Sequence, residues 1–295
     1  MRDAPPRQKY RLRHRLEAGL AYAVFGLLEL LPARAVSGLG GWLGRVAAPF
    51  AGARRTAERN LARALPEYDA GARARIVREA FDNFGRTMLE YAALSKIARD
   101  PGRTEVVGHE QLALMAAQGR PAMLFCAHLG NWEIIPPMLA RLAKPLTIVY
   151  RPANNPLVDR MIADLRAPYT AGMAPKGAMG ARQMLTALGA GEHVIMVVDQ
   201  KLNTGMEIPF FGQGAFTGDA VARFAMRFDC PVFPVRTERL EDGRFKVTVE
   251  EPFHFPPHGT EEDVREALVR INGRLEDWIR ARPGQWLWMH NRWPD

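Results

Sequence analysis

The sequence has little cysteine and none of the common metal-binding patterns. Its 295 residues include two cysteines, Cys126 and Cys230, and both lie in apolar runs. Such placement is typical of buried free thiols in a reducing compartment and not of a disulfide framework. Neither a Cys-x2-Cys pair nor a His-Glu-x-x-His segment occurs, so the familiar zinc motifs are missing. We therefore expect a protein without structural disulfides, and neither a metal ion nor an organic cofactor is implied.

The sequence also lacks an apolar run long enough to cross a bilayer at right angles. Ala18 to Leu31 is apolar apart from Glu29, which is short of the ~20 residues that such a span needs. A second, glycine-rich apolar stretch covers residues 35–52. Basic residues lie on both sides of these stretches, namely Arg2, Arg7, Lys9, Arg11, Arg13 and Arg15 before them and Arg54, Arg55, Arg59 and Arg63 after them.

Lys and Arg favour the cytoplasmic side of a membrane. We therefore predict that residues 1–60 form a helical membrane-anchoring segment, which lies in the cytoplasmic face or re-enters it. The alternative is that the two apolar stretches form a pair of buried core helices.

No low-complexity tract suggests disorder, and the 47% of apolar residues suffices for a large core. Residues 61–295 are predicted to form one catalytic domain. The net charge of +8 and the pI of about 9.9 suit an anionic partner. A membrane surface, a phosphorylated lipid, an acidic carrier protein and a nucleic acid all meet that description, so the charge alone does not choose among them.

Strands and helices alternate along residues 61–295. Short apolar runs at 123–127, 146–150, 194–198 and 231–236 read as strands, as does the alternating run at 245–249. Helical periodicity covers residues 69–98, 155–165 and 261–281. This order predicts an α/β fold with a mixed, mostly parallel central sheet flanked by helices.

The stretch around His128 is the centre of the predicted site. Residues 123–127 form a buried strand, Leu129-Gly130-Asn131 reads as a turn, and a helix is expected over 132–142. His128 then lies at the carboxyl end of a strand and Glu133 in the first turn of the next helix. In open α/β sheets, ligands bind in the crevice beyond the strand ends.

His128 and Glu133 suggest general-base chemistry. A histidine can take the proton of an alcohol near neutral pH, and a carboxylate on its other ring nitrogen fixes the tautomer and stabilises the imidazolium. We predict that Glu133 plays this orienting role, and that backbone N–H groups around Gly130 and Asn131 bind an oxyanion. The alternative is a purely structural histidine beside a glutamate favoured by the helix dipole.

The spacing His128-x4-Glu133 resembles the His-x4-Asp/Glu signature of glycerolipid-type acyltransferases. The longer sequence His-Leu-Gly-Asn-Trp-Glu is closer to one branch, the late acyltransferases of lipid A assembly (lauroyl and myristoyl transferases). Four further segments resemble that branch in order, namely Tyr150-Arg151-Pro152 with Asn154-Asn155, Val198-Asp199-Gln200, Pro209-Phe210-Phe211-Gly212 with Ala215 and Thr217, and Gln285-Trp286-Leu287-Trp288-Met289-His290.

The resemblance implies an enzyme that moves a fatty acyl group from an acyl carrier protein thioester to a hydroxyl of a lipid A precursor. It implies a location on the cytoplasmic face of the inner membrane, with membrane lipids as partners and no nucleic acid. By the same resemblance Arg166 and Asp199 lie near the catalytic centre, where Arg166 binds anionic acceptor groups and Asp199 orients a cation or the acceptor hydroxyl. We count Arg151, Gly130 and Asn131 as further substrate-binding residues.

Three alternatives remain open at this point. The same chemistry can serve a glycerophospholipid or another envelope glycolipid. A metal-dependent hydrolase can be imagined with His128, Asp199 and His193 as ligands. The basic surface also fits a non-enzymatic membrane-binding protein.

Overall fold

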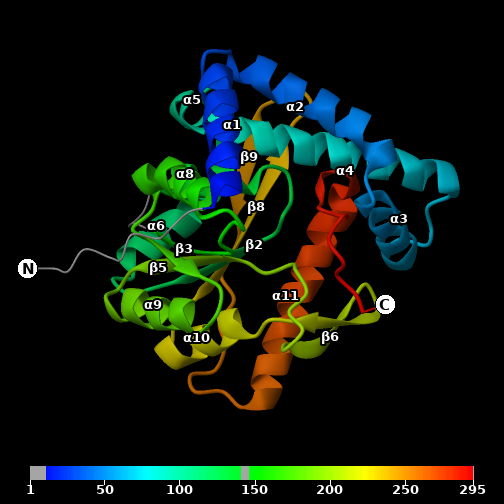
Figure 1. Ribbon diagram of the computed structural model, residues 1–295. Coiled ribbons are helices and arrows are strands. Elements are labelled where there is room, and N and C mark those ends of the chain that lie inside the picture. Colours follow the sequence, from blue (N-terminus) through cyan, green and yellow to red (C-terminus); the bar gives the residue numbers. More distant parts are fainter. Residues whose placement is uncertain (1–10, 141–145, 295) are drawn as a thin grey trace, which may run out of the picture.

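The computed structural model describes residues 11–140 and 146–294, which fold around a seven-stranded sheet in the order β1-β9-β8-β2-β5-β3-β4 (Figure 1). The strands are β1 Thr104–Val107, β2 Met123–Cys126, β3 Leu146–Tyr150, β4 Gly172–Pro175, β5 His193–Val197, β6 Met206–Phe210, β7 Gln213–Thr217, β8 Val232–Arg239 and β9 Phe245–Val249. The α-helices are α1 Leu12–Glu29, α2 Ala33–Ala47, α3 Ala53–Ala64, α4 Ala70–Glu90, α5 Leu94–Arg99, α6 His109–Ala117, α7 Ile135–Leu139, α8 Pro156–Arg166, α9 Ala178–Gly189, α10 Ala220–Phe228 and α11 Glu261–Ala281. Short 3₁₀ helices include η1 Ala48–Phe50, η2 Tyr91–Ala93, η3 Trp132–Ile134, η4 Ala167–Tyr169 and η5 Pro283–Gln285.

The predicted α/β fold with a mostly parallel sheet is confirmed. Strand β2 pairs in parallel with β5 and β8, β5 pairs in parallel with β3, and β3 with β4. Only β9 runs antiparallel to its neighbour β8, and β1 joins β9 in parallel. Within this sheet Cys126 at the end of β2 is in register with Val197 at the end of β5. The residues that follow these two strands therefore emerge side by side at one edge of the sheet.

Strand β2 lies in the middle of the sheet, and both of its faces are buried. Met123 and Phe125 belong to one apolar core, which includes much of α11, and Leu124 and Cys126 belong to a second core on the opposite face. This period-two division explains why the sequence shows a continuous apolar run there and no alternation. The structure thus holds the start of the 127–131 loop between two packed layers.

Two sequence-based boundaries need correction. The helix predicted over 69–98 ends at Glu90, where the chain tightens into η2 before α5 begins. The glycine-rich segment 209–217 forms part of the β6–β7 hairpin, whose two turn residues, Phe211 and Gly212, both have positive φ. Phe210 and Phe211 are buried in the core. These two aromatic rings are therefore packing residues of the core.

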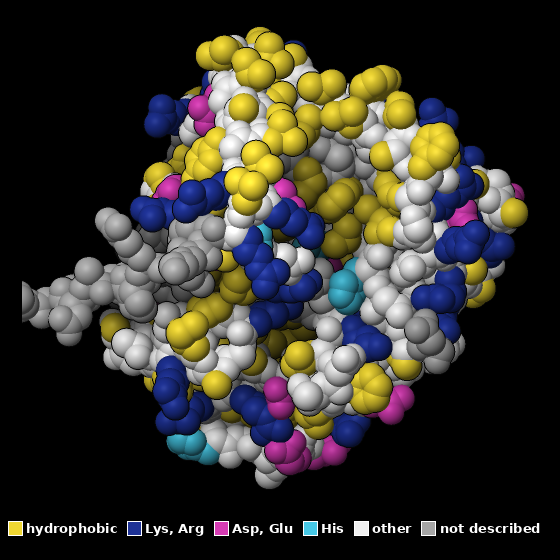
Figure 2. Space-filling model, in the orientation of Figure 1, with side chains coloured by type: hydrophobic (Ala, Val, Ile, Leu, Met, Phe, Trp, Pro, Cys, Tyr) yellow, Lys and Arg dark blue, Asp and Glu magenta, His cyan; other side chains and the backbone are white. Residues whose placement is uncertain are grey.

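The N-terminal helices α1 and α2, blue in Figure 1, lie at one end of the molecule, where α2 runs along α4 and α1 packs against α8 and η2. Helix α2 approaches α4 closely, because a Cβ on Gly40 would lie 2.4 Å from the carbonyl oxygen of Gly85 and a Cβ on Gly44 would lie 2.1 Å from that of Phe81. The outer surfaces remain apolar and exposed (Figure 2), which contradicts the alternative of two buried core helices. The exposed apolar residues include Leu12, Leu16, Leu20, Leu27 and Leu30 around α1, and Leu39, Trp42, Leu43, Val46 and Phe50 around α2 and η1.

Within residues 11–140 and 146–294, no helix combines the length and the apolar character that a membrane crossing requires. Three of the basic residues noted at the N-terminus, Arg2, Arg7 and Lys9, lie outside the described residues, as does the predicted end of the helix at 141–142. The division into segments 1–60 and 61–295 stays a prediction.

Candidate active site

His128 and Asp199 lie together because they follow neighbouring parallel strands. His128 Nδ1 is 2.7 Å from Asp199 Oδ1, and the backbone N–H of His128 donates to Asp199 Oδ2 at 2.9 Å. The indole Nε1–H of Trp286 donates to the same Oδ2 at 2.7 Å. The carboxylate is buried, whereas 16% of the His128 side chain is exposed. The Nδ1 edge of the imidazole is therefore bound to Asp199, and its other edge reaches solvent.

Asp199 is ionised at physiological pH despite its burial. Burial raises the pKa of a carboxyl group, but the charge of His128 and the hydrogen bonds from His128 and Trp286 outweigh it and lower the pKa of Asp199 to about 2. An ionised Asp199 accepts the Nδ1–H proton, so neutral His128 carries its free lone pair on Nε2. This is the tautomer that a general base needs.

The structure corrects the predicted role of Glu133. The carboxylate on Nδ1 is that of Asp199, and Glu133 faces Arg166 of α8, from which it accepts two hydrogen bonds at 2.6 and 2.9 Å. Arg166 also donates to the Tyr91 hydroxyl at 2.9 Å. Burial disfavours the charged guanidinium, but Glu133 more than offsets this and raises the pKa of Arg166. Burial, with the charge of Glu133, raises the pKa of Tyr91 well above its usual value.

The Glu133–Arg166 pair forms part of the wall of a cavity of about 260 Å³ that His128 also lines. Arg166 is thus near the candidate catalytic centre, and its binding of an anionic group stays a prediction. The other lining residues are Tyr91, Cys126, Trp132, Pro136, Ile148, Val149, Tyr150, Arg151, Lys176, Ile195, Val197 and Gln200. Much of this lining is apolar, and two exposed cations, Arg151 and Lys176, belong to it.

Gly130 and Asn131 serve the loop itself more than the cavity. The N–H of Gly130 donates to the carbonyl oxygen of Gln285 at 3.1 Å, so the predicted use of this group for an oxyanion is wrong in this arrangement. Gly130 has a φ of +57°, and a Cβ there would lie 2.5 Å from the carbonyl oxygen of Thr237. Only glycine fits that position. The Asn131 side chain is buried, where it accepts from the Glu133 N–H and donates to Glu90 at 2.7 Å.

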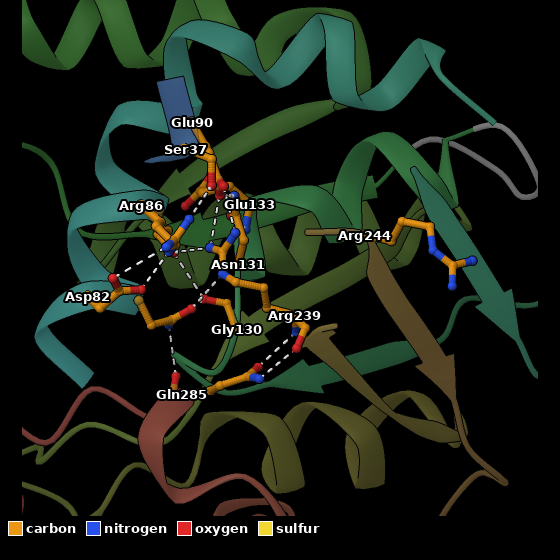
Figure 3. A network of polar contacts seen from close by, with 12 residues as sticks. Ser37, Asp82, Arg86, Glu90, Gly130, Asn131, Glu133, Arg239, Arg244 and Gln285 are labelled. Atoms are coloured by element: carbon orange, nitrogen blue, oxygen red, sulfur yellow. Dashed lines mark hydrogen bonds and ion pairs between the residues drawn. The ribbon is translucent and has the colours of Figure 1, made fainter. Parts of the chain in front are cut away.

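A buried polar network holds this loop from behind (Figure 3). Asn83 and Thr87 of α4 donate to the Gly130 carbonyl oxygen at 2.8 and 3.0 Å. Arg239 at the end of β8 makes two hydrogen bonds with Glu90, at 2.6 and 2.9 Å. Burial opposes the charge of Glu90, but Arg239 and the other donors outweigh it and lower the pKa of this carboxyl group.

The sequence does not predict the contacts of Asn83, Thr87, Glu90, Arg239 and Trp286, because each contact joins residues far apart in the chain. Arg239 and Glu90 are 149 positions apart, and Trp286 and Asp199 are 87 apart. No local spacing encodes such pairs. The one available signal was the Gln285-Trp286 segment, whose resemblance to the family pointed to the right region without giving a role.

We expect Glu90→Gln to destabilise the fold strongly. The substitution leaves Arg239 buried without its carboxylate, and breaking a buried ion pair costs about 3–5 kcal/mol. Urea unfolding followed by circular dichroism measures the loss. The matched control is Glu261→Gln, since Glu261 pairs with Arg223 at the surface and such pairs contribute little. Equal stability of the two variants would show that the network does not support the loop.

The remaining candidates do not join this site. His193 is the first residue of β5, whereas Asp199 follows the other end of that strand. The Nδ1 of His193 accepts a hydrogen bond from the backbone N–H of Ala122 at 3.1 Å. The proposed ligand set of a metal-dependent hydrolase is therefore not assembled, and the part of the chain that the structure describes contains no cluster of three or more His, Cys, Asp or Glu suited to a metal ion. Cys126 and Cys230 are free and buried, as predicted. Burial, together with Asp199 and Glu133, raises the pKa of Cys126 well above its usual value, which keeps it a protonated thiol.

A histidine oriented by a buried carboxylate, facing a cavity at the strand ends of an α/β sheet, is the arrangement of an enzyme that uses a general base. Residues 6–295 match the family described as bacterial lipid A biosynthesis acyltransferase. The match covers nearly the whole chain, so the chain belongs to this family and is an acyltransferase. The predicted resemblance is confirmed, and the non-enzymatic alternative is set aside.

Individual relatives are distant but align over almost their full length. The lipid A biosynthesis lauroyltransferase of Escherichia coli is 28% identical over 284 residues, which is 92% of this chain and 90% of the relative. The palmitoleoyltransferase of the same organism is 26% identical over 281 residues, with 91% and 88% covered. The phosphatidylinositol mannoside acyltransferase of Mycolicibacterium smegmatis is 24% identical over 288 residues, with 93% and 90% covered.

Proposed function

We propose that the protein transfers a fatty acyl chain from an acyl carrier protein thioester to a hydroxyl group of a lipid A precursor, at the cytoplasmic face of the inner membrane. The observation that carries this proposal is the His128 imidazole, held on Asp199 with its Nε2 edge toward the cavity, in a chain of the lipid A acyltransferase family. The relatives from Escherichia coli are named as acyltransferases of lipid A biosynthesis, which supports a lipid A precursor as the acceptor.

In the proposed reaction, His128 Nε2 takes the proton of the acceptor hydroxyl while the hydroxyl oxygen bonds to the thioester carbonyl carbon. The carbonyl electron pair moves to oxygen and gives a tetrahedral oxyanion. When this intermediate collapses, the carbon–sulfur bond breaks, and the departing thiolate of the carrier takes the proton from His128. Asp199 keeps the Nδ1 proton in place and stabilises the imidazolium between these two steps.

The oxyanion requires a donor other than Gly130. The Gln200 side-chain nitrogen is 3.5 Å from His128 Nε2 and belongs to the same cavity wall. Lys176 is the nearby exposed cation, and its pKa is lowered because of partial burial and the charge of Arg151, against the opposing charge of Asp199. We assign the oxyanion contact to Gln200 and electrostatic support to Lys176. Direct transfer is favoured over a covalent route, since the Cys126 thiol stays protonated.

Mass spectrometry of the lipid A fraction tests the proposal in cells. Cells that contain the protein are expected to yield lipid A heavier by one fatty acyl group than cells that lack it. An unchanged lipid A fraction with a changed phospholipid or other glycolipid fraction would favour the remaining alternative. The similarity to an acyltransferase of phosphatidylinositol mannoside is the observation that favours testing that alternative.

The donor preference gives a salt-dependent prediction. Carrier proteins are acidic, this chain has a net charge of +8, and exposed Arg151 and Lys176 line the cavity. We expect a higher kcat/KM with acyl carrier protein than with a coenzyme A thioester of the same chain. The advantage should shrink as salt rises, because the Debye length is only about 8 Å at physiological ionic strength. Equal efficiency with both donors at low salt would contradict the carrier assignment.

The exposed apolar surface of α1 and α2 gives a prediction on membrane binding. Replacing Leu20 and Leu27 with Glu should release the protein from anionic vesicles, because each buried Leu contributes about 1.5–3 kcal/mol and the new charges oppose insertion. Both side chains are about two-thirds exposed, at 68% and 67%, so the fold should tolerate the change. Val269→Glu on α11, at a 45% exposed site, is the control. Flotation of the Leu variant together with the vesicles would contradict this assignment.

A further inference from the structure

Arg292 is a buried cation that forms an ion pair with no carboxylate among the described residues. Its side chain is fully buried, and it donates to the Phe216 carbonyl oxygen at 2.9 Å and to Thr217 Oγ1 at 2.7 Å. Its Nε atom has no hydrogen-bond partner, and no carboxylate among the described residues lies within ion-pair distance of it. An isolated buried charge is unfavourable unless another charge compensates it.

Asp199 is a buried negative charge that likewise lacks a charged partner among the described residues when His128 is neutral. It is a buried carboxylate, and its three hydrogen-bond donors are the His128 ring, the His128 N–H and the Trp286 indole. When His128 is neutral, all three donors are neutral. Among residues 11–140 and 146–294, no permanent cation then contacts this negative charge directly.

The two unbalanced charges border the same aromatic cluster. The Arg292 guanidinium carbon lies 4.8 Å above the centre of the Phe210 ring, and Phe210 packs edge-on against Trp286 with a centroid distance of 5.9 Å. Trp286 in turn donates to Asp199. Phe210 and Trp286 are both buried in the core, so the attraction between the two buried charges is weakly screened. Burial lowers the pKa of Arg292 to about 10 although Asp199 acts in the opposite direction, so Arg292 stays protonated at neutral pH.

We propose that Arg292 is the fixed counter-charge of Asp199 and, through it, a positioning residue that keeps His128 unprotonated and ready as a base. Asp199 attracts a proton to His128, and the positive charge of Arg292 opposes that attraction. Arg292 thus offsets part of the negative charge of Asp199, while Asp199 still orients the imidazole. This proposal rests on the proposed role of His128 as the base.

The other charged groups around His128 do not supply this balance. Glu133 and Arg166 neutralise each other, and the Cys126 thiol is protonated. Lys176 also interacts with Asp199, but its side chain is largely exposed, so solvent screens its charge more than that of the fully buried Arg292. His290 has a lowered pKa, first because of its burial, and is therefore neutral at neutral pH. Arg292 is the buried and permanent cation of this group.

The pH profile of kcat/KM tests the proposal. In Arg292→Gln, His128 should hold its proton more tightly, so the acid limb moves to higher pH by about one unit, the order of effect of removing one charge from a protein interior. Activity then falls about tenfold below the limb and is unchanged on the alkaline plateau. Arg292→Lys keeps the charge, and Thr217→Val removes one hydrogen bond of Arg292 but not its charge. Neither should move the limb.

An acid limb that stays in place in folded Arg292→Gln would overturn the proposal, and so would a limb that moves equally in Thr217→Val. A loss of activity equal at every pH would also overturn it, because that is the pattern of a purely structural residue.

A double-mutant cycle on the free energy of unfolding gives a test that needs no activity. Asp199→Asn and Arg292→Gln are expected to destabilise the protein less together than the sum of the single changes, since the double variant leaves neither charge uncompensated. If Arg292→Gln alone fails to fold, the double variant should recover folding. Additive effects, or a double variant no better than Arg292→Gln, would refute the charge pairing. If the wild-type protein shows no acyl transfer, the proposed function fails while this cycle still decides the pairing.

Discussion

His128→Ala is expected to lower kcat by about 10²–10⁴-fold, which is the usual contribution of a general base. The variant lacks any group that can take the hydroxyl proton at the position of Nε2. Its fold should persist, because the His128 side chain lines the cavity and the contacts of the 127–131 loop with α4 are made by Gly130 and Asn131. Turnover with saturating donor and acceptor measures the effect, and circular dichroism checks the fold.

The control for this experiment is His254→Ala. His254 is exposed and lies in the loop after β9, away from the cavity lining. It should retain full turnover. Wild-type turnover in folded His128→Ala would contradict the proposed mechanism.

Asp199→Asn should reduce kcat by a comparable factor for a different reason. Asn has one oxygen, whereas Asp199 uses both of its oxygens to accept from the His128 ring, the His128 N–H and Trp286. The amide NH₂ must then face at least one N–H group, so the imidazole loses either its anchor or its tautomer. The negative charge that stabilises the imidazolium is lost as well. In a carboxylate–histidine pair this change can cost about 10⁴-fold in kcat.

Asp199→Asn is best compared with Asp229→Asn, since Asp229 is an exposed aspartate with φ of +45°, a conformation that Asn tolerates. The control should keep its kcat. A competing view, in which Glu133 orients His128, predicts that Glu133→Gln reduces kcat and Asp199→Asn does not. The measured order of these two variants separates the two assignments.

The acidic limb of stability follows from the same carboxylate. The pKa of Asp199 is lowered to about 2 in the folded protein from an ordinary value of 3.8. Its ionisation therefore stabilises the fold fully above about pH 4, and this contribution is lost as pH falls towards 2. The catalytic range near neutral pH lies well above that window.

The sequence predicts the position of His128 well because its determinants are local. An apolar run, a turn with Gly130 and a helix start at Trp132 follow one another within a few residues, and the structure has them in that order. The helix predicted over 261–281 is found with the same bounds, since a capping box at Thr260 and Asp263 marks its start.

The partner of His128 could not be deduced in the same way. The strand that follows β2 along the chain is β3, but the strand beside β2 in the sheet is β5. Only this crossover brings Asp199 next to His128, and local spacing favoured the nearby Glu133 instead. The proposed role of Arg292 could not be predicted from the sequence either, because it depends on the contacts of Arg292 with Phe210 and of Trp286 with Asp199 in the folded chain.

The most direct measurement is acyl transfer by the purified protein, with acyl carrier protein thioester and a lipid A precursor, and with the product mass determined for wild type and His128→Ala side by side. The account predicts a product heavier than the precursor by one acyl group, formed by the wild type and suppressed at least a hundredfold in the variant. Equal product from the two proteins, or none from folded wild type with any chain length of donor, would contradict it.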